Sequence, residues 1–385
     1  MLDLSDIPRP QGADVQVFYG ISPSLGASWS TWQKPRGCTF ISIFCLGGGG
    51  SGSAGTNGSS TTTTGGGGGG SGAQSSMLFF ANDLPDTLYV SVGKGAARPL
   101  TGIGSIGAPT VVSLLPDTTS NFLLCVVNGG GAGSLITQGT GGAASTISTN
   151  PLAGLGFPSY GLASSANTSV AGINGGKGNQ RLTTTATAGT GTVATLTFST
   201  TGTVQYAVGD TITVANVTPT GYNGTFTVTA CTATTVSYAN ITTAAQTVAG
   251  TIVGPSTPIS ISVTGCVTTG GGGGGAGGPS SLAPGINGTD SRFFPVSTTL
   301  SSLAIIPGGI GSIGNGTNGG NGVKVSGSLI FLGGAGGGGA ATAIGGNGGD
   351  GAYGCGGGGG GGTFSSVTVG AGGAGGDGLC IITAW

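Results

Sequence analysis

Carboxylates are the main groups in this sequence that could transfer protons, because it contains ten Asp but neither His nor Glu. Two Asp side chains on either side of a glycosidic bond are the usual means of cleaving glycans. The candidates are Asp83 and Asp86 on either side of a proline, Asp290, and Asp350 and Asp377 in Gly-Asp-Gly triplets. Asp in such surroundings commonly caps a turn. We favour that interpretation and predict that the chain is not an enzyme and has no catalytic residues.

The cysteines could hold a metal or form disulfides, but their arrangement favours neither. They are odd in number and include no C-x-x-C pair: Cys38, Cys45, Cys125, Cys231, Cys266, Cys355 and Cys380. Without His, a zinc site is not expected. Most lie in or beside apolar runs, which is typical of buried free thiols that pack as small hydrophobic groups.

Nucleotide-binding motifs are not indicated either. G-x-G-x-x-G matches occur only because Gly is abundant, and no tract continues into the G-K-[ST] of a phosphate-binding loop. We predict no metal and no cofactor.

Aromatic residues between glycines and turn residues are the remaining candidates for binding, because loops carry most binding groups. As possible receptor contacts we select Phe157, Tyr160, Phe293, Phe294, Tyr353 and Phe364. A rigid aromatic ring can stack on a sugar or fill a receptor pocket at small entropic cost. The alternative is that these rings hold loops to the body of the protein. Trp29 and Trp32, near the N-terminus, are candidates for docking to an assembly.

The low charge limits the classes of partner. Charged residues make up 5% of the chain and the net charge is -1. Such a surface offers no electrostatic attraction for nucleic acid or for an anionic membrane. No apolar run reaches the roughly 18 residues of a membrane span. Residues 1–10 lack the basic start and apolar core of a signal peptide, so we expect synthesis in a cytosol.

The composition predicts an all-β fold rather than disorder. Gly accounts for 90 of the 385 residues, and Gly, Thr and Ser are poor helix formers. Disordered chains usually combine high charge with few apolar residues, whereas this chain is 37% hydrophobic. Short apolar runs lead directly into glycines, as in residues 39–46, 121–127, 259–268 and 328–332. We therefore expect a glycine-rich body of short strands whose glycine tracts are ordered.

The tracts between 345 and 378 repeat loosely as Gly-Gly-X. Three residues per turn is the period of the polyproline II helix, which has no internal hydrogen bonds. Its backbone groups must be satisfied by neighbours, and Gly allows backbones to approach closely enough. We predict packed polyglycine helices of this type, with flexible linkers as the alternative.

Residues 181–254 are poor in glycine and alternate polar and apolar residues with period two, which predicts half-buried antiparallel strands. Asn223-Gly224 predicts a hairpin with two positive φ values. We expect a small β-sandwich or barrel inserted into the glycine-rich body. The predicted divisions are an N-terminal docking or covering segment (1–37), the first half of the body (38–180), the insert (181–254) and the second half of the body (255–385).

Several ordered segments resemble a known family. They are WQKPRGCTFISIFCLGGGG from Trp32, GGGGGGSGAQ from Gly65, LPDTLYVSVGKG from Leu84 and GGAGGDGLCIITAW from Gly372. Their succession looks like the glycine-rich domain of bacteriophage tail-fibre and virion proteins, mainly over 32–100 and 330–385. The stretch from Tyr206, YAVGDTITVANVTPTGYNGTFTVTACTATTVSYA, resembles a small β-module of phage structural proteins.

The resemblance implies a virion structural protein, assembled in the host cytoplasm. We expect a tail-fibre or fibre-tip adhesin that binds the host surface without catalysis. An architectural capsid-decoration or collar protein is the alternative, and a glycan-cleaving spike is a more distant one. The expected partners are other virion proteins, further copies of this chain in a homo-oligomer such as a trimer, and a host glycan or outer-membrane protein. Nucleic-acid binding and membrane insertion are not expected.

Overall fold

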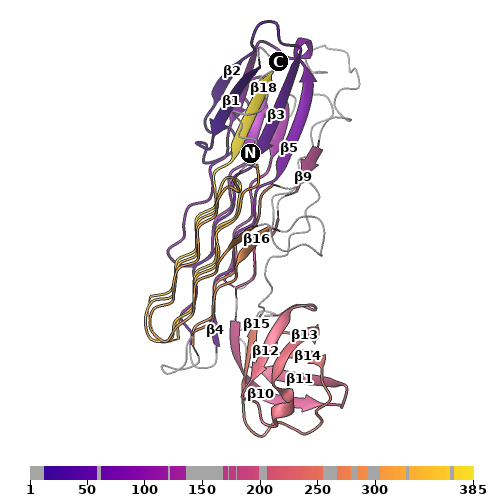
Figure 1. Ribbon diagram of the computed structural model, residues 1–385, viewed down its shortest axis with the longest axis vertical. Coiled ribbons are helices and arrows are strands. Elements are labelled where there is room, and N and C mark those ends of the chain that lie inside the picture. The colour runs from indigo at the N-terminus through magenta and orange to yellow at the C-terminus, as the bar shows by residue number, and fades with distance from the viewer. Residues whose placement is uncertain are drawn as a thin grey trace.

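The computed structural model describes residues 13–58, 62–119, 122–135, 168–171, 173–178, 180–198, 206–254, 267–278, 285–293, 304–326, 329–364 and 368–385. Within these ranges the protein is all-β, as predicted, with only the short 3-10 turns η1 (Ala81–Asp83) and η3 (Thr220–Tyr222). Figure 1 shows three parts arranged end to end: a cap of two sheets, a bundle of extended glycine-rich segments, and a small barrel.

The cap contains two antiparallel sheets. One has the order β1 (Asp14–Tyr19), β18 (Leu379–Ala384), β3 (Phe40–Leu46), β5 (Gln74–Phe80) and β9 (Thr168–Val170). The other has the order β2 (Ser30–Gln33), β6 (Thr87–Ser91), β7 (Thr110–Ser113) and β8 (Leu123–Val127). The last strand, β18, lies between β1 and β3, so the two ends of the chain meet in one sheet (Figure 1).

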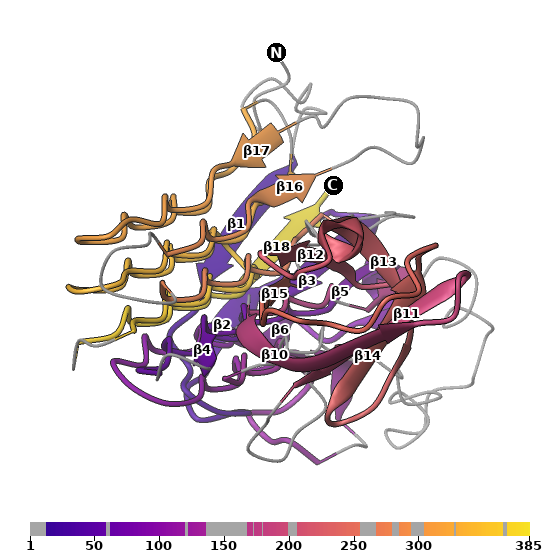
Figure 2. The same ribbon diagram turned by 90° about the horizontal axis from the view of Figure 1, so that it is seen from below.

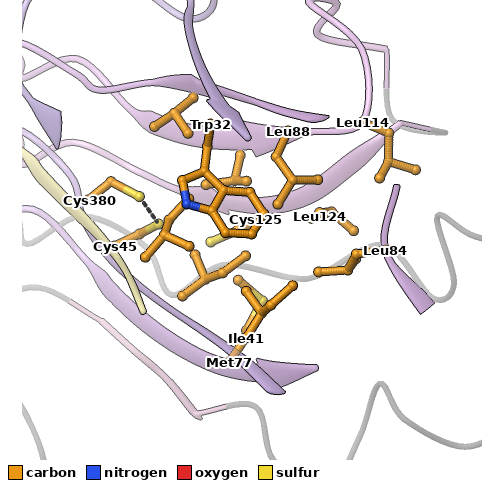
Figure 3. Packing of buried hydrophobic residues seen from close by; sticks show 14 of the residues in the cluster. Trp32, Ile41, Cys45, Met77, Leu84, Leu88, Leu114, Leu124, Cys125 and Cys380 are labelled. Atoms are coloured by element: carbon orange, nitrogen blue, oxygen red, sulfur yellow. Dashed lines mark hydrogen bonds between the residues drawn. The ribbon is translucent and has the colours of Figure 1, made fainter. Parts of the chain in front are cut away.

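The two cap sheets enclose an apolar core, to which both contribute alternate residues (Figure 3). Trp32 is its largest side chain and is 0% exposed. The predicted role of Trp32 in assembly docking is wrong, because the ring packs inside the cap and is not accessible to a partner. The other candidate, Trp29, is half-buried.

The glycine-rich bundle is built from extended segments that bond to their neighbours with a period of three residues. In segment 48–56, the N–H groups of residues 49, 52 and 55 donate to segment 370–376. Those of residues 50, 53 and 56 donate to segment 64–70, and those of residues 48, 51 and 54 to segment 102–108. All nine distances are 2.8–3.0 Å. This period is that of polyproline II, so the predicted packing of polyglycine helices is confirmed.

The bundle requires Gly because of contact distance rather than unusual backbone angles. A Cβ atom added to Gly49 would lie 1.8 Å from the carbonyl oxygen of Cys355, and one added to Gly356 would lie 1.9 Å from that of Gly69. Real Cβ atoms do not approach backbone so closely, so a side chain there would separate the helices. Figure 2 shows the result as stacked layers of zigzag chain, clearest in the orange and yellow part.

The insert is a barrel of six strands. Its sheet has the order β11 (Val193–Phe198), β14 (Thr235–Ala239), β13 (Gly224–Cys231), β12 (Thr211–Ala215), β15 (Thr251–Gly254) and β10 (Gln180–Gly189). Pairing of β10 with β11 closes it. On its other side β10 also pairs with β4 (Thr62–Thr64), which comes from the bundle. A separate pair, β16 (Ser291–Phe293) and β17 (Ala304–Ile306), lies beside the bundle.

The predicted Asn223-Gly224 hairpin is wrong. Asn223 has φ -79° and follows the 3-10 turn η3, while Gly224, with φ 148°, begins strand β13. The side chain of Asn223 explains the difference. Its Oδ1 accepts the N–H of Val217 at 2.9 Å, and its Nδ2 donates to the carbonyl of Val217 at 3.0 Å. These bonds stabilise a wider loop instead of a two-residue turn.

One ion pair joins the bundle to the barrel. Lys177 Nζ lies 2.9 Å from both carboxylate oxygens of Asp210, which also accepts the N–H of Ala207 at 2.7 Å. Asp210 is only 8% exposed. Removal of its cation leaves a desolvated carboxylate, so we expect Lys177→Met to lower the free energy of unfolding by about 1–3 kcal/mol. Urea denaturation of purified protein measures this loss.

The exposed pair Lys34–Asp86 provides the control, because the Asp86 side chain is 89% exposed. Asp86→Asn should change the free energy of unfolding by less than about 1 kcal/mol. Equal effects of the two substitutions would contradict the stabilising role of the Lys177–Asp210 pair.

Candidate functional site

The predicted binding aromatics do not form one cluster in the described part of the chain. Phe157, Tyr160 and Phe294 lie outside the described residues, and of Phe293 only the backbone, in β16, is described. Phe364 is half-buried at the end of a glycine segment. Tyr353 is exposed, at 39%. Its ring lies 5.9 Å from that of Tyr19, which is 55% exposed, so these two tyrosines form an exposed aromatic pair.

Two of the selected carboxylates do not cap turns. Asp350 Oδ1 accepts the N–H of Ala374, and Asp377 Oδ1 accepts the N–H of Gly95, both at 2.8 Å. Each bond joins separate segments of the bundle. The turn-capping interpretation is therefore wrong for these two residues, and their role is to bridge neighbouring helices.

Asp350 belongs to a ladder of Asn and Asp side chains on the outer layer of the bundle. We define this outer layer as segments 315–322, 344–353 and 368–378. Oδ1 atoms of the first segment accept N–H groups of the second: Asn315 from Ile344, Asn318 from Asn347, and Asn321 from Asp350, at 3.2, 2.8 and 2.9 Å. The second segment bridges to the third in the same way, since Asn347 Oδ1 accepts the N–H of Ala371 at 2.8 Å.

The ladder compensates for missing neighbours. Inside the bundle each N–H finds the carbonyl of an adjacent helix, but on the outside of a layer no further helix supplies one. An amide or carboxylate oxygen takes its place, as a side chain does at a helix N-cap. The same device recurs at Asn287, which accepts the N–H of Gly311, and at Asp290, which accepts that of Gly308, both at 2.9 Å.

The ladder has a signal in the sequence that was not among the predictions. Asn or Asp recurs at every third position in NGTNGGN from Asn315 and in NGGD from Asn347. In a helix with three residues per turn, such positions lie on one face. Ile344, Asn347 and Asp350 therefore form a single column. Tyr353, three residues further on, lies in the turn that ends the segment and belongs to the exposed aromatic pair.

A second exposed surface lies on the outer face of the cap sheet that contains β1. Val15, Val17 and Tyr19 alternate along β1 and are 44%, 36% and 55% exposed. The far end of the sheet adds Phe80 and Trp385, at 47% and 38%, and Phe40 packs against both rings. Strand β1 is also an edge of its sheet. An apolar face beside an open strand edge is typical of a surface that pairs with another protein.

Three thiols meet in the cap core. Cys45 Sγ donates to Cys380 Sγ at 3.5 Å, directly across strands β3 and β18, and Cys45 also bonds to Cys125 in the same core (Figure 3). A hydrogen bond with Cys45, together with burial, raises the pKa of Cys125. For Cys45, the bond with Cys125 lowers the pKa, but the bond with Cys380 and burial outweigh it, so its pKa is also raised.

These shifts predict a loss of stability at alkaline pH. A thiol with a raised pKa in the folded state stabilises the fold fully below the unfolded-state pKa of about 8.5, and that contribution is lost as pH rises from there towards the folded-state pKa. We expect the free energy of unfolding to fall steadily above this pH in denaturant titrations. The fall should be shallower in Cys45→Ala/Cys125→Ala. An equally steep fall in that double variant would contradict a thiol origin.

The described residues offer no further chemical centre. Within them, no group of three or more His, Cys, Asp or Glu side chains could hold a metal ion. No helix in the same ranges is long and apolar enough to cross a membrane.

The family described as a glycine-rich domain matches residues 23–290, more than half of the chain. No curated protein matches the chain.

Proposed function

We propose that this chain, which belongs to the glycine-rich domain family, is a bacteriophage tail-fibre or fibre-tip adhesin that binds the host surface without catalysis. Its other partners would be virion proteins and further copies of the chain, as in a trimer, within the assembled virion. The observation that carries the proposal is the distribution of surfaces along the molecule. The apolar face and the open β1 edge lie on the cap, and the barrel lies at the opposite end of the bundle (Figure 1).

The rigidity of the bundle supports an adhesin in which the bundle is a spacer between the cap and the barrel. Its helices are joined to several neighbours by backbone bonds, and the Lys177–Asp210 pair and the β4–β10 pairing attach the barrel to it. A rigid spacer holds a binding surface at a fixed distance from its point of attachment. An adhesin needs such a spacer, because binding is tighter when the contact groups are already ordered.

A cell-binding experiment tests the proposal. Purified full-length chain, labelled on exposed lysines such as Lys94 and Lys324, is incubated with a panel of bacterial strains, and infection of those strains by the phage that encodes the chain is measured in its presence. We expect saturable binding to susceptible strains and competition with infection. Binding to virion particles without binding to any cell would replace the adhesin with the architectural alternative. Release of reducing sugar from cell-surface polysaccharide would overturn the non-catalytic part of the proposal.

A further inference from the structure

The outer layer carries polar groups that the fold does not use. In Asn315, Asn318 and Asn321, the side-chain Oδ1 accepts a hydrogen bond from a backbone N–H of the next segment. None of these three residues donates a hydrogen bond from Nδ2 to another described residue. Because the bond to Oδ1 fixes the plane of the amide, both N–H bonds of each Nδ2 are held in a set direction. All three side chains are exposed.

The spacing of these donors is regular. In a polyproline II helix, three residues advance about 9 Å, since the rise is about 3.1 Å per residue. The three amides therefore form a straight row on a flat support. An extended polymer with hydrogen-bonding groups at regular intervals matches such a row better than a compact ligand does.

An aromatic platform adjoins the row. Tyr353 is three residues beyond Asp350, in the turn that ends this segment, and its ring lies 5.9 Å from that of Tyr19. The buried ring of Phe331 packs edge-to-face against Tyr353 at 5.8 Å, which holds the tyrosine ring in place. Exposed, supported tyrosine rings give a large contact area at low entropic cost. The apolar face of a pyranose ring fits this type of surface.

The charges of the layer favour a neutral ligand. Arg98 Nη2 lies 2.9 Å from Asp350 Oδ1, so these two charges offset one another. The ion pairs among the described residues include neither Asp377, in the adjoining segment, nor the exposed Lys324, three residues beyond Asn321. These two charges are opposite, so the four charged groups sum to zero. The layer therefore offers an anionic sugar no net attraction, whereas hydroxyl groups could bond to the carboxylate and to the amides.

We propose that the outer layer binds a neutral, extended glycan, with a pyranose ring stacked on Tyr353 and Tyr19 and further hydroxyls bonded to the amides of Asn321, Asn318 and Asn315. This inference rests on the proposed function and names the contact surface within it. It places that surface on the side of the bundle, beside the cap, and not on the barrel.

The test separates binding from folding by using substitutions that keep the ladder intact. Asn→Asp at positions 315, 318 and 321 retains the oxygen that accepts the backbone N–H, as Asp350 and Asp290 already do, but removes the Nδ2 donors. Tyr353→Leu removes an aromatic ring of the platform and leaves the amide donors in place. Asn287→Asp places a carboxylate at another Oδ1 that accepts a backbone N–H, away from the outer layer, and is the control for the added charge. Thermal unfolding of each full-length variant verifies its fold.

Binding is measured on an immobilised panel of neutral glucose, galactose, mannose and N-acetylglucosamine oligosaccharides, with sialylated and uronic-acid oligosaccharides for comparison. We expect the parent chain and Asn287→Asp to bind at least one neutral glycan equally. The triple Asn→Asp variant and Tyr353→Leu should each bind it at least tenfold more weakly. Parent binding that is confined to acidic glycans, absent from the panel, or unchanged in both the triple variant and Tyr353→Leu would overturn the inference.

Cell attachment distinguishes this inference from the proposed function. If the triple variant and Tyr353→Leu attach to susceptible cells as the parent does, the outer layer is not the contact surface, and the adhesin proposal stands without it. If the parent itself does not attach to cells, the adhesin proposal fails regardless of the glycan result.

Discussion

Gly358→Ala is expected to unfold the glycine bundle or to reduce its free energy of unfolding by about 3 kcal/mol or more, at the upper end of overpacking effects. The new Cβ would lie 2.1 Å from the carbonyl oxygen of Ala335 and 2.5 Å from its carbon. Both obstacles are backbone, and segment 332–340 is itself bonded to several helices, so the clash cannot be relieved by a rotamer change. Calorimetric unfolding of the full chain measures the effect.

Gly314→Ala is the matched control. Gly314 belongs to the same bundle, but nothing lies within 4 Å of the position that its Cβ would take, and its φ is not positive. The substitution should be neutral or stabilise by up to about 1 kcal/mol, because Ala restricts the unfolded chain. Similar melting temperatures for the Gly358→Ala and Gly314→Ala proteins would refute the view that close backbone contact is why the bundle needs Gly.

Trp32→Ala is expected to reduce the free energy of unfolding by about 3–5 kcal/mol, the usual cost of removing a large aromatic from a core. The ring is 0% exposed and packs between the two cap sheets (Figure 3). Equilibrium denaturation followed by far-ultraviolet circular dichroism measures the loss. This signal does not depend on the fluorescence of the deleted residue.

Two further substitutions refine this result. Trp32→Phe should cost less than Trp32→Ala, because it fills most of the space and removes an Nε1–H that has no hydrogen-bond partner among the described residues. Trp29→Ala, at a half-buried position, should cost much less than Trp32→Ala. If Trp32→Ala were neutral for folding but abolished incorporation into virions, the docking role predicted from the sequence would be restored.

The alternating polar and apolar residues between 181 and 254 were sufficient to predict antiparallel strands, since side chains on a strand face opposite ways whatever the strand pairs with. Closure into a barrel depended on more distant contacts. Strand β10 is long enough to pair with β15 along its first half and with β11 along its second, with an irregularity between Thr184 and Ala186. No local pattern indicates which strands such a strand will join.

The candidate site was predictable only in part. Tyr353 could be selected because an aromatic among glycines is conspicuous, but its neighbour Tyr19 is more than 300 residues away in the sequence. The Asn and Asp ladder has a local signal of period three, yet its bonds join residues 24 or 29 apart. Recognising it required knowledge of which segments form the outer layer.

By itself the sequence determined that the chain has neither His nor Glu, that it is all-β, and that its glycine tracts have a period of three. Only the tertiary structure decided which of these tracts meet. The physical reason is that glycine helices recognise one another through backbone N–H and C=O groups, which are identical at every position. Their partners are therefore selected by the strands and turns that flank them. Three of the Asp residues first considered for catalysis, Asp290, Asp350 and Asp377, acquire their observed role as bridges between helices from that arrangement.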